Sequence, residues 1–270
     1  MPRLNELTKA PSLSFFIYGV SGVGKTTFGG SIGSRGVIFD LGKASTTLSS
    51  NQFKKLYPNS NPIVEVITET TDARGLVKNP TAYDELSDLL DKYIGSDEVD
   101  VIVIDDFTVL IQFALNKALD INKDERKSQT LDKAISGRTI PITMVQDYGT
   151  LIDILKFFIG TYTQLCREHG KHFIVLGHPR YIYKTGKIGE EPKPSKIIPS
   201  APGKDTFAVG QLPAMFDEIY FMYLEGGKNR ALKTQATGIH LAKTSYPMEL
   251  SDPEVNTDFP SILQKIKGVI

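Results

Sequence analysis

The chain has 270 residues, 40% of them hydrophobic, so it can bury the core of one large α/β domain and is not expected to be disordered. Its 31 basic and 31 acidic residues cancel, so any nucleic-acid site must be a local patch. The single cysteine, Cys166, excludes a disulfide framework and favours a reducing compartment. No secretory leader and no apolar run of about 20 residues is found, so we expect a cytoplasmic protein without membrane association.

The first strong pattern is an apolar strand followed by a glycine-rich loop. Residues 13–18 are almost all apolar, as expected of a strand that is buried on both faces. The next residues fit the pattern G-x-x-x-x-G-K-[ST]: Gly19, Val20, Ser21, Gly22, Val23, Gly24, Lys25 and Thr26. Backbone N–H groups of such a loop surround phosphate oxygens, the lysine reaches the outer phosphates, and the hydroxyl ligates Mg²⁺. A helix beginning at Thr27 would direct its N-terminus at the nucleotide. The sequence therefore predicts a nucleoside-triphosphate site.

Three further apolar segments predict strands with polar ends. Residues 36–40 end in Asp40, residues 99–106 end in Asp105 and Asp106, and residues 172–178 end in His178, while residues 63–67 are a weaker candidate strand. We predict that Asp105 belongs to the Mg²⁺ shell, because a buried strand holds its carboxylate rigidly beside the phosphate loop. Asp106 either polarises the attacking water or caps the helix that follows it. His178 either senses the terminal phosphate or is structural.

Apolar residues at helical spacing predict helices over residues 81–94 and 107–119, and from 146 to about 169. Two long polar stretches, 120–143 and 179–213, are predicted to be irregular loops. The second has six basic and three acidic residues, an excess of three positive charges. Basic residues interleaved with aromatic ones are typical of a groove for single-stranded nucleic acid, although an ordinary solvated loop gives the same pattern. The candidate DNA-binding residues in the two stretches are Lys123, Arg126, Lys127, Arg138, Arg180, Tyr181, Tyr183, Lys184, Lys187, Lys193 and Lys196.

The last part of the chain predicts an antiparallel extension of the sheet. Residues 217–224, 230–235 and 238–243 are candidate strands, and residues 262–266 form a short amphipathic segment. We therefore divide the chain into an N-terminal tail (1–12), an ATPase core (13–245) and a C-terminal extension (246–270). The predicted fold is α/β: a mostly parallel twisted sheet flanked by helices, with antiparallel strands at its C-terminal side.

The N-K-x-D signature of GTPases is not found, so ATP is the expected nucleotide. The order of the predicted strands resembles the RecA-like P-loop ATPases rather than the AAA+ layout with its helical lid domain. Residues 146–149 (QDYG), 174–178 (IVLGH) and 230–234 (RALKT) are similar to phage-encoded, core-only recombinases that anneal single strands.

This resemblance implies an ATP-binding, ATP-hydrolysing protein that binds single-stranded DNA in phage or bacterial recombination. In RecA-like proteins, two loops line the DNA channel, and the matching positions are the two polar stretches, 120–143 and 179–213. The resemblance also implies self-association into a filament or ring, a single-strand-binding protein as a candidate partner, and the cytosol of a bacterial host if the chain is phage-encoded. Hydrolysis would be stimulated by DNA, and it would be slow if ATP serves mainly as a conformational switch.

Two positions depart from the RecA-like pattern. The catalytic glutamate expected after the second strand is missing, so either Asp40 or Asp106 activates the water, or ATP acts mainly as a conformational switch. Of the pair of basic residues that related filaments supply across the subunit interface, only Lys243 is found. It would act on the neighbour's γ-phosphate as an arginine finger does, or it is a solvated lysine at a strand end.

Two other functions fit the same phosphate loop. One is a P-loop switch or loader that acts on protein partners, with the basic loops as docking surfaces. The other is a small-molecule kinase, which is disfavoured because no cluster of lid arginines stands out.

Overall fold

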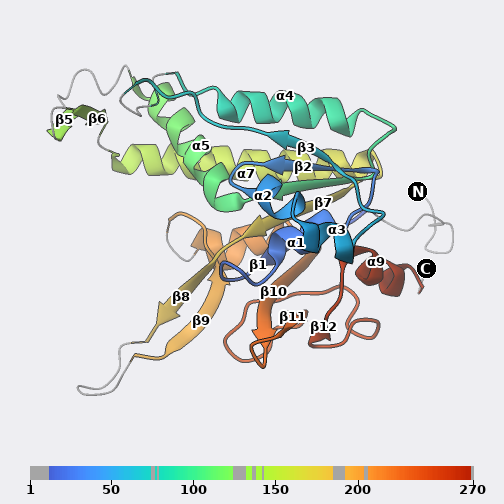
Figure 1. The fold of residues 1–270 in the computed structure, drawn as a ribbon. Helices are drawn as coiled ribbons and strands as arrows, with labels where there is room; N and C mark the ends of the chain where they lie inside the picture. Colours follow the sequence, from blue (N-terminus) through green and yellow to red (C-terminus); the bar gives the residue numbers. More distant parts are fainter. Residues whose placement is uncertain are drawn as a thin grey trace, which may run out of the picture.

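A computed structural model of the chain describes residues 12–73, 77, 79–123, 132–135, 138–141, 143–184, 192–203 and 206–268. Its centre is an eight-stranded sheet in the order β12-β11-β10-β1-β7-β4-β2-β3 (Figure 1). The six strands from β3 to β10 are parallel, and β11 and β12 are added antiparallel. The strands are β1 (Ser14–Tyr18), β2 (Gly36–Asp40), β3 (Ile63–Val66), β4 (Val101–Asp105), β7 (His172–Gly177), β10 (Glu218–Glu225), β11 (Asn229–Lys233) and β12 (Glu254–Val255).

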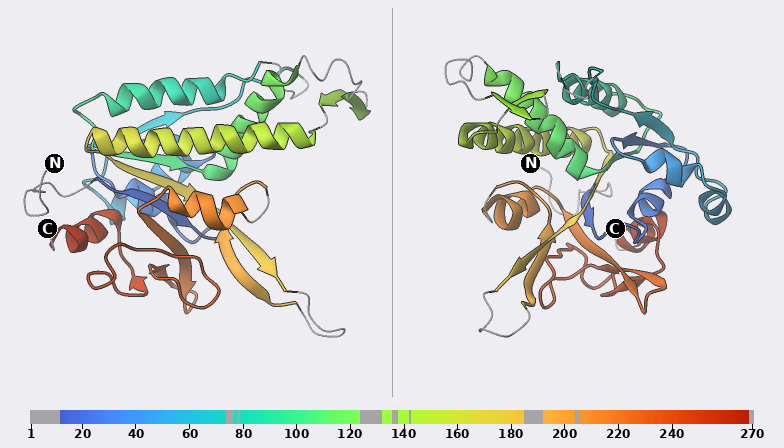
Figure 2. Two further views of the ribbon diagram at one scale, coloured as in Figure 1. Left: turned by 180° about the vertical axis from the view of Figure 1, so that it is seen from behind. Right: turned by 60° about the vertical axis from the view of Figure 1, so that its left-hand side comes forward.

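Helices cover both faces of this sheet, as the two further views show (Figure 2). One face carries α1 (Lys25–Gly30), α2 (Ala44–Leu48), α3 (Asn51–Leu56) and α9 (Phe259–Lys267). The other carries α4 (Ala82–Ile94), α5 (Phe107–Ile121) and α7 (Val145–Glu168), with the short π-helical turn η2 (Thr206–Gln211) and α8 (Leu212–Ala214) beside them. The predicted α/β fold class is therefore confirmed.

The alternation of side chains along β1 explains why residues 15–18 of the first strand are all apolar or aromatic. Phe15 and Ile17 point into the core beneath α1 and α9, whereas Phe16 and Tyr18 point into the core beneath α5 and α7. Successive side chains of a strand leave on opposite faces, so a strand covered on both faces needs apolar residues at every position. All five residues of β1 are buried for this reason.

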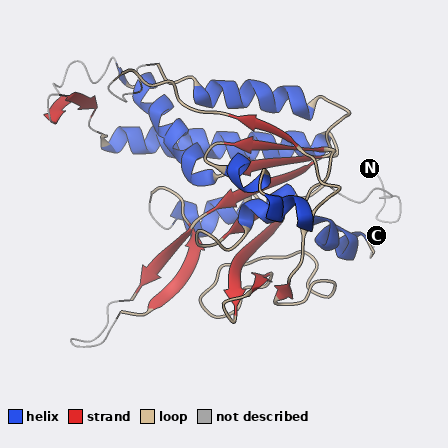
Figure 3. Ribbon diagram, viewed as in Figure 1, coloured by secondary structure: helices blue, strands red, loops and turns tan. Residues whose placement is uncertain are grey.

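Both polar stretches contain paired strands, which corrects the prediction of irregular loops. In the first, β5 (Asp132–Ile135) pairs with β6 (Arg138–Pro141). In the second, β8 (Pro179–Tyr183) pairs with β9 (Pro194–Pro199), and this hairpin extends away from the central sheet (Figure 3). Each pair forms a separate two-stranded ladder, so neither hairpin adds a strand to the large sheet.

Two other predictions need correction. Residues 238–243 do not form a regular strand, because they make only isolated bridges, from His240 to Ile197 and from Lys243 to Ile219. The short helices α2 and α3 were not predicted, and α9 is longer than the amphipathic segment 262–266 that marked it. None of the helices in the described ranges combines the length and the apolar character needed to cross a membrane.

Candidate functional site

The phosphate loop runs from the end of β1 into α1 and is held in place by its neighbours. The N–H of Gly19 donates to the carbonyl of Gly177 at the end of β7, at 3.2 Å. A Cβ atom at Gly19 would lie 2.2 Å from the carbonyl oxygen of Met222 in β10, so only glycine allows this close approach. The two strands that flank β1 therefore fix the position at which the loop begins.

Gly24, the last loop residue before Lys25, has φ = 100°, in the left-handed region that favours glycine. A Cβ there would lie 2.5 Å from Cδ of Arg230, whose side chain packs against the loop from β11. The Nη2 group of Arg230 donates to the hydroxyl of Tyr57 at 3.3 Å, while its Nη1 atom is buried without a hydrogen-bond partner among the described residues. Arg230 thus packs against the phosphate loop at Gly24.

Lys25 is buried, with 7% of its surface exposed, and its Nζ donates to the carbonyls of Gly19 (2.7 Å) and Val20 (3.1 Å) in its own loop. Burial lowers the pKa of Lys25, and the nearby carboxylates of Asp105 and Asp106 partly oppose this. The ammonium group is therefore held at the mouth of the loop, where the sequence predicted a contact with outer phosphates.

Thr26 and Asp105 form the pair of oxygen ligands that the sequence predicted for Mg²⁺. The hydroxyl of Thr26 donates to Oδ2 of Asp105 at 2.7 Å, across the gap between α1 and the end of β4. Burial raises the pKa of Asp105 to about 6, and the Thr26 hydroxyl lowers it in part. Mg²⁺ prefers oxygen ligands and usually takes only one or two from protein, so this pair fits the ion. No group of three or more potential His, Cys, Asp and Glu ligands occurs within the described ranges.

Asp106 uses its two carboxylate oxygens differently. Oδ1 accepts the N–H of Val109 at 3.0 Å and caps α5, so the predicted cap is present. Oδ2 lies 3.2 Å from Nε2 of His178, at the end of the neighbouring strand β7. The carboxylate therefore both caps the helix and faces the imidazole, and the geometry leaves open its predicted role towards water.

The second carboxylate proposed to activate water, Asp40, has a structural position. Its Oδ1 accepts the N–H groups of Gly42 (3.0 Å) and Ala44 (2.8 Å), and its Oδ2 accepts that of Ser45 (2.8 Å). Only 1% of Asp40 is exposed. We therefore correct that prediction, because a buried carboxylate that accepts three backbone N–H groups holds the turn into α2 and is not available as a base.

These elements enclose a cleft of about 420 Å³. It combines most of the phosphate loop, both aspartates at the end of β4, the histidine after β7 and one wall that the sequence did not identify. Its lining residues are Ser21, Gly22, Gly24, Lys25, Thr26, Thr27, Gly42, Lys43, Ala44, Thr47, Asp105, Asp106 and His178. The predicted nucleotide residues Gly19, Val20 and Val23 belong to the loop but do not line this cleft.

The wall that sequence reasoning missed comes from residues 42–47, the turn after β2 and the first residues of α2. The only clue was the place of these residues directly after a strand. Because β2 pairs with β4 and Asp40 lies opposite Asp105, the chain that leaves β2 passes beside Asp105. Parallel strands present their carboxyl ends at one edge of the sheet, and a ligand binds there. Lys43 and Thr47 thereby join the cleft without belonging to any motif.

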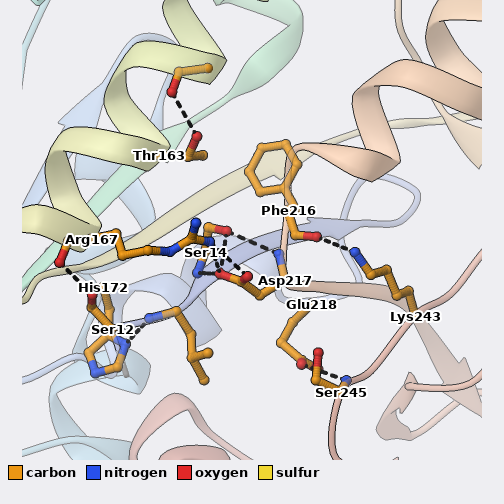
Figure 4. A network of polar contacts seen from close by, with 12 residues as sticks. Ser12, Ser14, Thr163, Arg167, His172, Phe216, Asp217, Glu218, Lys243 and Ser245 are labelled. Atoms are coloured by element: carbon orange, nitrogen blue, oxygen red, sulfur yellow. Dashed lines mark hydrogen bonds and ion pairs between the residues drawn. The ribbon is translucent and has the colours of Figure 1, made fainter. Parts of the chain in front are cut away.

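Lys243, predicted to act on a neighbouring subunit, lies far from its own cleft along the sheet. It bridges Ile219 near the beginning of β10, whereas the phosphate loop follows the end of the parallel neighbour β1. Its Nζ donates to the carbonyl of Phe216 at 2.6 Å (Figure 4). Lys243 therefore takes no part in the cleft of its own chain, and its action on a neighbour stays a prediction.

The candidate DNA residues fall into three groups. Tyr181 and Tyr183 in β8 are 39% and 55% exposed, and Lys184, Lys193 and Lys196 are also exposed. Arg180 is tied to the base of the hairpin, where its Nη1 donates to the carbonyls of Ala201 and Gly203, each at 3.2 Å. Lys123 pairs with Asp120. Arg126, Lys127 and Lys187 lie outside the described residues, as does the side chain of Arg138.

Comparison with known proteins supports the nucleotide site. A family model described as an AAA domain, a type of P-loop ATPase, matches residues 12–246. A search of curated proteins gives no significant match. The family match supports a P-loop ATPase but does not confirm the resemblance to recombinases. It also qualifies the expectation against an AAA layout, although in the described residues the chain beyond β11 carries only β12 and α9 rather than a multi-helix domain.

Proposed function

The chain belongs to the AAA-domain family of P-loop ATPases, and from that premise we propose that it is an ATP-dependent protein that binds and anneals single-stranded DNA. The observation that carries this proposal is the attachment of the β8–β9 hairpin to His178, which lines the nucleotide cleft, and to Tyr18, the residue before the phosphate loop. The hairpin carries exposed aromatic and basic side chains, and the cleft carries the groups to which we assign the binding and hydrolysis of ATP.

On the nucleotide side, each residue has a distinct task. The loop N–H groups and Lys25 bind the phosphates, and Thr26 with Asp105 holds Mg²⁺, which when bound neutralises phosphate charge. Asp106 accepts a proton from the attacking water, and His178 orients that carboxylate through the 3.2 Å contact with its Oδ2. Asp106 is thus the base in this proposal.

The first strand of the hairpin continues directly from the cleft. Pro179, where β8 begins, follows His178, and the carbonyl of His178 accepts the N–H of Ser200, immediately after β9, at 2.7 Å. Any displacement of His178 by a terminal phosphate is therefore transmitted to both strands at the base of the hairpin.

The second strand is attached to the strand that precedes the phosphate loop. The buried hydroxyl of Tyr18 lies 3.0 Å from the carbonyl of Ile197 in β9 and 2.7 Å from that of Leu241. Tyr18 is the residue before Gly19. β8 is thus linked to His178, which faces Asp106, and β9 is linked to Tyr18, at the beginning of the phosphate loop. We propose that nucleotide binding affects the hairpin through both contacts.

The hairpin has the side chains that single-strand binding requires. Tyr181 and Tyr183 offer exposed ring faces for stacking with bases, which contributes about 1–3 kcal/mol per base. Exposed Lys184, Lys193 and Lys196 supply positive charge for the phosphate backbone. Stacking does not depend on base identity, so we expect little sequence preference.

The decisive measurement is the fluorescence anisotropy of a labelled single-stranded oligonucleotide, at low salt, with and without a non-hydrolysable ATP analogue. We expect ATP-dependent binding that weakens steeply with salt, and a loss of about tenfold or more in the double variant Tyr181→Ala/Tyr183→Ala. Tyr148→Ala removes a tyrosine of α7 that is 48% exposed and serves as the matched control. Absence of binding by the unaltered protein would refute the proposal and favour a switch or loader acting on protein partners.

Self-association belongs to the same proposal. We propose a filament or ring in which Lys243 of one subunit reaches the nucleotide of the next. Light scattering with the analogue and single-stranded DNA should then report large assemblies, and Lys243→Ala should reduce hydrolysis in them without changing nucleotide affinity. Scattering of a monomer or dimer under these conditions would contradict the filament.

A further inference from the structure

Lys43 is the least expected residue of the cleft. It follows β2 by three positions and occupies the N-cap of α2, on the wall that faces the phosphate loop. Its side chain is exposed, and no hydrogen bond or ion pair ties its ammonium group to any described residue. By contrast, the ammonium group of Lys171 donates to two backbone carbonyls, those of Ser96 and Val99. Lys43 therefore presents a cation without a structural task.

The charges in the cleft explain what such a cation would do. Among the residues that the structure describes, Lys25 is the only other lysine or arginine on the lining, which also carries the carboxylates of Asp105 and Asp106. A nucleoside triphosphate keeps net negative charge after it binds one Mg²⁺, and the two carboxylates add to it. One lysine does not balance these charges, whereas a second lysine on the opposite wall brings the site closer to neutrality.

The backbone of Lys43 is held firmly even though its side chain is not. Asp40 accepts N–H groups on both sides of it, from Gly42 at 3.0 Å and from Ala44 at 2.8 Å. The side chain of Lys43 itself makes no capping hydrogen bond to α2. Asp40 is thus a positioning residue that places Lys43 on the wall, and truncation of the Lys43 side chain removes no internal hydrogen bond.

We propose that Lys43 contacts the terminal phosphate of the bound triphosphate, as a second cation supplied by the same chain. Its ammonium group can donate up to three hydrogen bonds to phosphate oxygens. A diphosphate lacks the group that Lys43 would contact, so Lys43 would make the site prefer ATP over ADP. This role rests on the nucleotide site alone and is independent of DNA binding.

The test is the equilibrium affinity for a non-hydrolysable ATP analogue and for ADP, each with Mg²⁺ and without DNA, measured by calorimetry. Lys43→Gln keeps much of the side-chain length but removes the charge, and we expect about tenfold weaker binding of the analogue with less than threefold change for ADP. Lys43→Arg keeps the charge and should keep the preference. Lys55→Gln, at an exposed lysine of α3 that does not line the cleft, should change neither affinity.

Equal weakening of the analogue and ADP in Lys43→Gln would overturn the proposal, because the lysine would then be a general contributor of positive charge. Unchanged affinity for both nucleotides would overturn it as well. Thermal unfolding without nucleotide checks the fold of each variant, and unaltered midpoints are expected because no internal contact is lost. Since DNA is absent, failure of the single-strand hypothesis would leave this result intact.

Discussion

The hydroxyl of Tyr18 in β1 lies 3.0 Å from the carbonyl oxygen of Ile197 in β9, although 179 positions separate the two residues in the sequence. This contact joins the strand that begins the phosphate loop to the hairpin that we propose binds DNA. It also involves only a side-chain hydroxyl, so it can be removed without altering the rest of the strand.

Tyr18→Phe should uncouple the hairpin from the nucleotide. The loss of this hydroxyl should lower the free energy of unfolding by about 1–3 kcal/mol, because the carbonyl of Leu241 loses its 2.7 Å contact while that of Ile197 keeps the N–H of Leu241. Nucleotide affinity should change little, whereas the ATP-dependent gain in DNA affinity should fall severalfold in the anisotropy assay.

Tyr220→Phe is the matched control for this variant. Tyr220 is also buried and hydrogen-bonded, but its hydroxyl donates to Glu218 in its own strand, at 2.7 Å, and has no contact with the hairpin. A full nucleotide response in Tyr18→Phe, or the same loss in Tyr220→Phe, would argue against coupling through Tyr18.

Gly24→Ala should abolish nucleotide binding for two separable reasons. The residue has φ = 100°, and the new Cβ would lie 2.5 Å from Cδ of Arg230. Gly22→Ala tests the first reason alone, because Gly22 has φ = 83° and no heavy atom of the described residues beyond its two chain neighbours lies within 4 Å of its Cβ position. We expect at least tenfold weaker binding of a fluorescent nucleotide in Gly24→Ala than in Gly22→Ala, and partial recovery in Gly24→Ala/Arg230→Ala. Equal losses in the two single variants would exclude the steric contribution of Arg230.

Asp106→Asn should keep the N-terminal cap of α5 but remove the proposed catalytic base. Asparagine caps helices as well as aspartate does, so α5 should be retained, but an amide cannot accept the proton of the attacking water. ATP hydrolysis should fall about 100-fold or more while nucleotide affinity stays within a few-fold. Asp258→Asn alters the equivalent cap of α9, where Oδ1 accepts the N–H of Ser261 at 2.9 Å, and should leave hydrolysis unchanged. Normal turnover in Asp106→Asn would remove Asp106 as the base.

His172 should make the protein sensitive to acid. Burial lowers its pKa to about 4, and its Nδ1 accepts the N–H of Leu13 at 3.1 Å. The ordinary pKa of histidine is about 6.5, so between pH 6.5 and 4 the unfolded chain binds more protons than the folded one. The free energy of unfolding should therefore be greatest above pH 6.5 and fall by about 3 kcal/mol as the pH drops to 4.

Denaturant unfolding as a function of pH measures this effect of His172. His172→Asn keeps an acceptor near the N–H of Leu13 and should flatten the profile in this range, with some loss of stability at neutral pH because a buried ring is removed. His169→Asn alters an exposed histidine just after α7 and should leave the profile as it is. An unchanged slope in His172→Asn would assign the acid sensitivity to other groups.

The part of the site carried by consecutive residues was predictable from the sequence. The phosphate loop is one contiguous motif, and Asp105, Asp106 and His178 were found because parallel strands present their carboxyl ends together. The family match, over residues 12–246, also supports a P-loop ATPase. The particular roles of these residues stay predictions. The role proposed for Asp40 was revised, because only the folded turn shows which N–H groups surround its carboxylate.

The features that the sequence did not reveal depend on long-range contacts or on unusual pairing of strands. Pro179, Pro194 and Pro199 stand at the ends of β8 and β9, and proline usually indicates an interruption of strands. They are tolerated because they stand at the ends of the two strands, where the missing N–H does not interrupt the middle of a ladder. Lys43 belongs to no motif, and the contact of Tyr18 with Ile197 requires the whole fold.

The carboxyl ends of β2, β4 and β7 lie level with one another, and this limits where residues can be inserted or deleted. Asp40, Asp105 and Leu176 are register partners across β2, β4 and β7. Deletion of one residue within β4 would turn Asp105 to the opposite face and separate it from Thr26, because side chains alternate along a strand. Insertions in the turns outside the strands leave this alignment intact. Single-residue deletions scanned through β4 should therefore all be inactive, whereas short insertions after Gly226 should be tolerated.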